Sequence, residues 1–92
     1  MSMSHKGLVK LSEEAAEVTQ VAQKLVAYPE LEFDDIDKHP DGSNLRQRLE
    51  EEMGDVLAAI DFVTTKLNLA SESIQDRRAL KLVTFRRWDR ES

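Results

Sequence analysis

The sequence contains no cysteine, which excludes disulfide bonds and thiolate metal sites. It has only three glycines and two prolines, and aromatic residues make up 5% of it. The turn residues and aromatics typical of sheet-rich folds are therefore scarce. No apolar run is long enough to cross a bilayer, and no signal-peptide pattern is present. These absences leave a cytoplasmic protein that does not interact with membranes as the default expectation.

The 92 residues are long enough for one modest hydrophobic core and too short for two. We therefore expect a single domain that spans residues 1–92. Hydrophobic residues make up 40% of the chain and charged residues 34%, which is ordinary for a charge-rich helical protein. A core of this size often gains stability from oligomerisation, because a second copy covers apolar surface that one chain leaves exposed.

The net charge of −5 is unevenly distributed along the chain. Through residue 55 there are 13 acidic residues against 6 basic ones, whereas residues 76–92 contain 3 acidic and 6 basic residues. An acidic body argues against a general nucleic-acid binder. The distribution suits a site in which carboxylates that bind a metal face cations that bind phosphate.

The spacing of apolar residues predicts an all-α fold with two long helices and a shorter C-terminal helix, completed by oligomerisation. The first helix is expected from Leu8 until Tyr28-Pro29 ends it, after a loosely held segment at residues 1–6. The second is expected from an N-cap at Asn44, with Gln47 completing a capping box. Its apolar positions recur every three or four residues: Leu45, Leu49, Met53, Val56, Ile60, Val63 and Leu67.

The third helix is expected from Ile74 to about Arg87, with Ser73 and Asp76 as its N-terminal signal. The connection at residues 30–43 is longer than the usual helix–helix connection of about 2–8 residues. It is either a functional flap or a surface loop, and Leu31, Phe33 and Ile36 suggest that part of it packs.

Two pairs of carboxylates lie three residues apart beside the predicted apolar stripes. Glu14 and Glu17 belong to the first helix, and Glu52 and Asp55 to the second. If the helices pack together, the four side chains converge and repel one another unless a cation lies among them. Hard oxygen ligands suit Mg²⁺, with Mn²⁺ as an alternative. The sequence therefore predicts a divalent-metal site.

Several of these features also have ordinary structural explanations. A single acidic pair on a charged helix is usually solvated surface, but a second pair beside the longest apolar stripe makes that explanation weaker. Gly54 indicates either a tight helix crossing or the close approach of a ligand. Arg78 and Lys81 are either phosphate-binding residues or part of a solvated face.

The two acidic motifs resemble those of the MazG-like, all-α nucleotide pyrophosphohydrolases. The matching strings are residues 12–18 and residues 51–57, and the basic residues from Lys81 to Arg87 are similar to that family's C-terminal helix. The resemblance implies cleavage of nucleoside triphosphates between the α- and β-phosphates, which releases a nucleoside monophosphate and pyrophosphate. It also implies a homodimer or homotetramer.

The resemblance further implies roles for individual residues. Mg²⁺ would be held by Glu14, Glu17, Glu52 and Asp55. Glu13 and Glu14 would be catalytic, with Glu13 orienting a water or holding a further ion. Arg78 and Lys81 would bind the triphosphate. The alternative function is a non-catalytic helical interaction module, in which the acidic surface binds a basic partner or sets the register of an oligomer.

Overall fold

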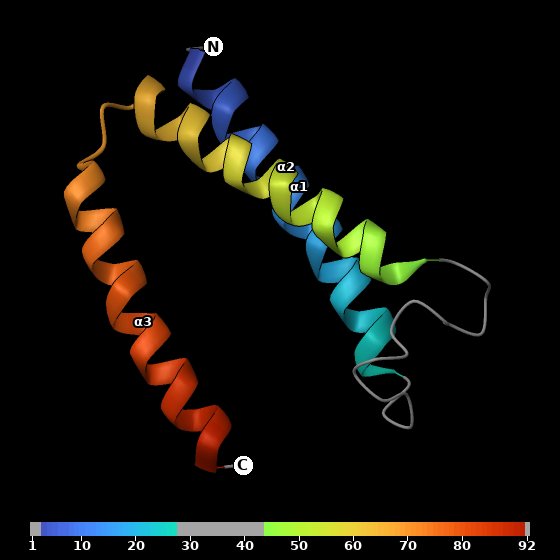
Figure 1. Ribbon diagram of the computed structural model, residues 1–92. Helices are drawn as coiled ribbons and strands as arrows, with labels where there is room; N and C mark the ends of the chain where they lie inside the picture. Colours follow the sequence, from blue (N-terminus) through green and yellow to red (C-terminus); the bar gives the residue numbers. More distant parts are fainter. Residues whose placement is uncertain (1–2, 28–43, 92) are drawn as a thin grey trace.

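The computed structural model describes residues 3–27 and 44–91, with the side chains of residues 3–5 left out. This part of the chain forms three helices, α1 (Met3–Val26), α2 (Leu45–Lys66) and α3 (Ser71–Glu91), and contains no strand (Figure 1). The predicted all-α fold is confirmed. The predictions for Tyr28-Pro29 and for the connection at residues 30–43 lie outside the described residues.

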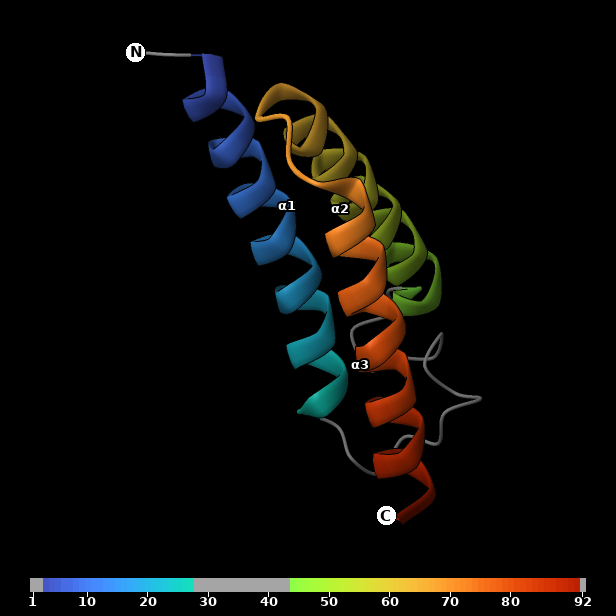
Figure 2. The same cartoon turned by 90° about the vertical axis from the view of Figure 1, so that its left-hand side faces the viewer.

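Helices α1 and α2 run antiparallel and pack along their length (Figures 1 and 2). The buried hydrophobic side chains between them are Val21, Leu45, Ala59 and Val63. The two helices approach closely at Gly7, where an added Cβ would lie 3.3 Å from Cε1 of Phe62 and 3.4 Å from Cγ2 of Val63. This pairing sets the distance between the side chains of the candidate site.

An asparagine lies at each end of α2: Asn44 is the N-cap, and Asn68 follows the C-cap residue Leu67. At the N-terminus, Oδ1 of Asn44 accepts a hydrogen bond of 3.0 Å from the backbone N–H of Gln47, as predicted. The Gln47 side chain turns forward along the helix and donates to Oε1 of Glu51. At the C-terminus, Asn68 has a φ of 52°, and the N–H of Leu69 bonds to the carbonyl of Thr64. This is a Schellman motif, which ends the helix and redirects the chain.

Three predicted helix boundaries are wrong, because α3 also continues to Glu91, beyond its predicted end at about Arg87. Helix α1 begins at Met3 rather than Leu8, because an apolar stripe marks only the part of a helix that packs. Helix α3 begins at Ser71, so Ser73 and Asp76 lie inside it and do not cap it. Glu72 in the first turn favours this earlier start through the helix dipole. With 21 residues, α3 is nearly as long as the 22-residue α2.

Helix α3 contributes little to the core. None of its described residues is buried, and it diverges from α2 after the short connection at residues 67–70 (Figure 1). The Cα positions span 44 × 31 × 16 Å, so the molecule is flat and open. No helix of the described residues has the length and apolar character that crossing a membrane requires.

Candidate metal centre

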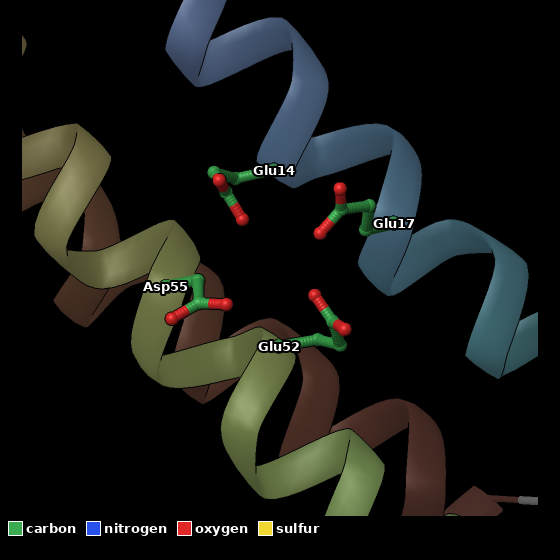
Figure 3. Close-up of side chains that lie close together, drawn as sticks. All are labelled: Glu14, Glu17, Glu52 and Asp55. Atoms are coloured by element: carbon green, nitrogen blue, oxygen red, sulfur yellow. The ribbon is translucent and has the colours of Figure 1, made fainter.

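The four predicted carboxylates meet between α1 and α2 (Figure 3). Glu14 and Glu17 lie one helical turn apart on α1, and Glu52 and Asp55 occupy the equivalent positions on α2. One carboxylate oxygen from each residue lies within 4.8 Å of those from the other three. The predicted convergence is confirmed, and we call these residues the four-acid cluster.

Two oxygens of the four-acid cluster are shielded from solvent without a partner. Oε2 of Glu14 and Oε2 of Glu52 accept no hydrogen bond from the described residues. Both side chains are half-buried, whereas Glu17 and Asp55 are exposed. A desolvated carboxylate oxygen without a hydrogen bond is unfavourable. A proton or a cation would relieve that cost.

The pKa values of two members of the cluster are raised, so the cluster disfavours additional negative charge. Burial raises the pKa of Glu14, and the charges of Glu17 and Asp55 raise it further, while Lys10 opposes them. The pKa of Glu52 is raised first by hydrogen bonding with Glu17, then by burial and the neighbouring carboxylates. The site therefore favours positive charge, whether it is supplied by protons or by a metal ion.

The chemistry and size of the cluster fit a hard divalent cation. All four donors are carboxylate oxygens, which Mg²⁺ and Mn²⁺ prefer. Opposite ligands of an octahedral Mg²⁺ lie about 4.2 Å apart. The carboxylate oxygens of the cluster lie within 4.8 Å of one another, so small side-chain rotations would bring them to the distances of Mg²⁺ ligands. Because Mg²⁺ usually keeps several waters, it does not need direct bonds to all four residues.

Lys10 is the cation that sequence reasoning missed. Its Nζ lies 3.0 Å from Oε2 of Glu13, and this contact raises the pKa of Lys10. Lys10 also lowers the pKa of Glu14. The spacing of four residues between Lys10 and Glu14 could have revealed it, since such residues share one face of a helix.

A pocket of about 380 Å³ adjoins the four-acid cluster. It is lined by residues of α1 and α2: Lys10, Glu14, Asp55, Ala58, Ala59 and Phe62. One carboxylate from each helix, an ammonium group and an aromatic ring therefore surround one space. Such a space suits a ligand that carries both charged and apolar parts.

The other predicted site residues lie outside the four-acid cluster. Glu13 is exposed and paired with Lys10. On α3, Nη1 of Arg78 donates to Oε1 of Gln75 at 3.0 Å, and Nζ of Lys81 lies 6.0 Å from the centre of the Phe85 ring. Both cations contact neighbours on their own helix, and the pocket beside Glu14 is lined from α1 and α2. Their predicted roles stay predictions.

Gly54 does not form a tight helix crossing in the described part of the chain. It is exposed, and a Cβ added there would meet nothing within 4 Å. The close approach of α1 to α2 occurs at Gly7 instead. The acidic residues near Gly54 therefore owe their position to the helix pairing and not to this glycine.

A scan against models of protein families, a search of curated proteins and a search of solved structures all gave no match. The resemblance to MazG-like pyrophosphohydrolases therefore depends on the two acidic motifs.

Proposed function

We propose that the protein is a Mg²⁺-dependent nucleoside triphosphate pyrophosphohydrolase. Its substrates would be ribo- or deoxyribonucleoside triphosphates, cleaved between the α- and β-phosphates to the monophosphate and pyrophosphate. The observation that carries this proposal is the four-acid cluster, in which two helices direct carboxylates toward one point. The similarity of both acidic motifs to MazG-like enzymes supports the choice of reaction.

The charges of the site support a phosphate substrate bound together with a divalent cation. A triphosphate alone would be repelled by four carboxylates, so it requires a cation between itself and the protein. When bound, Mg²⁺ neutralises phosphate charge, orients the substrate and makes a coordinated water more acidic. Glu14, Glu17, Glu52 and Asp55 would hold this ion, or Mn²⁺ in its place.

The surrounding residues would position the substrate. Lys10 lines the pocket beside Glu14, where its ammonium group would contact a phosphate oxygen. The Phe62 ring is half-exposed in the same pocket and would contact an apolar part of the nucleotide. Glu13 adjoins Glu14 and would orient the attacking water. Arg78 and Lys81 would bind phosphate if α3 approaches a site in an assembled oligomer.

A substrate panel tests the proposed reaction. The protein is incubated with ribo- and deoxyribonucleoside triphosphates and Mg²⁺, and the products are identified chromatographically. Monophosphate and pyrophosphate are expected, and an excess of chelator should abolish their release. Diphosphate with inorganic phosphate would assign a different reaction, and an inert protein would contradict the proposal.

A non-catalytic interaction module is the second candidate. It is favoured by the exposure of Glu17 and Asp55, which a basic partner protein could reach. The same panel separates the two functions, because an interaction module releases no pyrophosphate with any triphosphate.

A further inference from the structure

Lys10 is the basic residue among the described side chains that line the pocket beside the four-acid cluster. It precedes Glu14 by four residues, so the two side chains occupy the same face of α1 about one turn apart. Asp55 of α2 lines the same pocket. An ion held by Glu14 and Asp55 would therefore lie beside the space that the Lys10 ammonium group enters.

The charge of Lys10 and the charges of the cluster act on each other. The contact with Glu13 raises the pKa of Lys10, and the charges of Glu14 and Glu17 raise it further. Burial and the charges of Glu17 and Asp55 raise the pKa of Glu14, whereas Lys10 lowers it. The ammonium group is therefore close enough to change the affinity of the cluster for other charges.

A weak contact holds Lys10 at the edge of the cluster. Its Nζ lies 3.0 Å from Oε2 of Glu13, and the two side chains are 61% and 52% exposed. An ion pair this exposed contributes little to stability. Oε2 of Glu14 accepts no hydrogen bond from Lys10 or from any other described residue. The long, flexible side chain of Lys10 can therefore move from Glu13 to an anion in the pocket.

The same ammonium group has opposite effects on the two forms in which a divalent ion can arrive. A hydrated Mg²⁺ ion at the cluster is repelled by the positive charge of Lys10. A Mg²⁺ ion that carries a triphosphate belongs to a complex of net negative charge, and its phosphate oxygens accept strong hydrogen bonds from an ammonium group. Lys10 therefore weakens the binding of the first form and strengthens the binding of the second.

We propose that Lys10 makes the four-acid cluster select a Mg²⁺ ion already bound to a polyphosphate over the free ion. This inference rests on the metal binding of the proposed function and adds how the ion arrives, which is together with the substrate. Between substrates, Lys10 is paired with Glu13 and opposes filling of the cluster by free Mg²⁺. When the complex binds, Lys10 leaves Glu13 and contacts a phosphate oxygen.

Isothermal titration calorimetry with two probes tests this selection. The probes are Mg²⁺ alone and inorganic tripolyphosphate premixed with an equal concentration of Mg²⁺. Lys10→Gln should bind free Mg²⁺ about threefold to tenfold more tightly than wild type, because it removes a positive charge near the ion. The same variant should bind the tripolyphosphate complex at least about tenfold more weakly, because it loses a charge-assisted hydrogen bond. Lys10→Arg keeps the charge and should resemble wild type with both probes.

Lys6→Gln is the matched control. It removes the same charge from the same helix at an exposed position, about 12 Å along α1 from Glu14. It should change both dissociation constants by less than about twofold at physiological ionic strength, where the Debye length is about 8 Å. Circular dichroism should show the helicity of wild type in all three variants.

Opposite shifts with the two probes in Lys10→Gln, absent from Lys6→Gln, would support the proposal. Shifts of the same sign with both probes, equal effects of the two substitutions, or a wild type that binds neither probe would overturn it. The substrate panel reports separately on the proposed function. Opposite shifts in an inert protein would support selection by Lys10 and contradict hydrolysis, whereas pyrophosphate release without opposite shifts would support hydrolysis and overturn selection by Lys10.

Discussion

Glu14 and Glu52 hold carboxyl groups where burial and neighbouring carboxylates both oppose ionisation. Each has one oxygen shielded from solvent and without a hydrogen-bond donor among the described residues. An apolar side chain at either position would avoid this unfavourable arrangement. The presence of acidic residues at these two positions is explained if a bound cation completes the site.

The first residue-scale prediction concerns the proposed ligands. Glu14→Gln, Glu52→Gln and Asp55→Asn should each reduce pyrophosphate release at least about 100-fold, because even groups outside the ligand shell contribute about 10–100-fold. Steady-state kinetics measures the loss, and circular dichroism should show unchanged helicity. Glu50→Gln is the control, since Glu50 is exposed and outside the four-acid cluster. Near-normal turnover in all three ligand variants would refute the site.

The second residue-scale prediction concerns pH in the absence of metal. Because the pKa values of Glu14 and Glu52 are raised above 4.5 in the folded state, the folded protein binds their protons more tightly than the unfolded chain. Their contribution to the free energy of unfolding therefore falls as pH rises from about 4.5 through the raised values, then levels off.

Thermal unfolding in chelator at a series of pH values measures this effect. Glu52→Gln should lose less stability than wild type over that interval, since it removes one titrating group and relieves repulsion at neutral pH. Glu50→Gln again serves as the control. If the stability of wild type and of Glu52→Gln declined equally over this pH interval, the raised pKa of Glu52 in the folded protein would be contradicted.

At the scale of elements, the antiparallel pairing of α1 and α2 determines the site. Each helix carries its two acids three residues apart, so they occupy adjacent turns on one side. The buried residues Val21, Ala59 and Val63 hold the helices together, and Gly7 permits their close approach near one end. Neither helix alone gathers more than two carboxylates.

The two helical glycines give a matched prediction. Gly54→Ala should raise the free energy of unfolding by about 1 kcal/mol, because alanine is the better helix former and its Cβ meets nothing within 4 Å. This corresponds to about 4–8 °C in Tm for a domain of this size. Gly7→Ala should give a smaller gain or a loss, because its Cβ would crowd Phe62 and Val63. Denaturant unfolding of both variants measures the difference, and a larger gain from Gly7→Ala would contradict this packing.

At the scale of the whole molecule, the bound ion would connect helices that share only a small core. Mg²⁺ should therefore raise the Tm of wild type, with a stabilisation of about 2.7 kcal/mol at a hundredfold excess over Kd. Glu52→Gln should show a much smaller shift, as measured by differential scanning fluorimetry with and without Mg²⁺. Equal shifts in both proteins would mean that the ion binds elsewhere.

The flat, open shape of the chain leaves apolar side chains exposed. The α1–α2 pair carries the four-acid cluster and also an apolar groove lined by Val18, Met53, Val56 and Leu57, while none of the described residues of α3 is buried. One chain therefore provides all four carboxylates of the candidate site, while large apolar side chains of α3 such as Trp88 remain exposed.

The sequence by itself determined the local features. Apolar spacing predicted three helices, the Asn44 signal predicted the start of α2, and the intervals of three residues indicated which acids would share a side of each helix. These features depend on neighbours within about one turn, so local propensity and periodicity suffice. The ends of α1 and α3 were less predictable, because helices continue beyond the residues that pack.

Only the tertiary structure decided which groups meet. It joined Glu14 and Glu17 to Glu52 and Asp55 and brought Lys10 and Phe62 into the adjoining pocket. Of the two explanations open for Gly54, it ruled out a tight helix crossing, because the helices approach closely at Gly7. It also directed α3, with Arg78 and Lys81, away from the pair that carries the cluster. These outcomes depend on how helices orient against one another, and periodicity within one helix carries no information about that orientation.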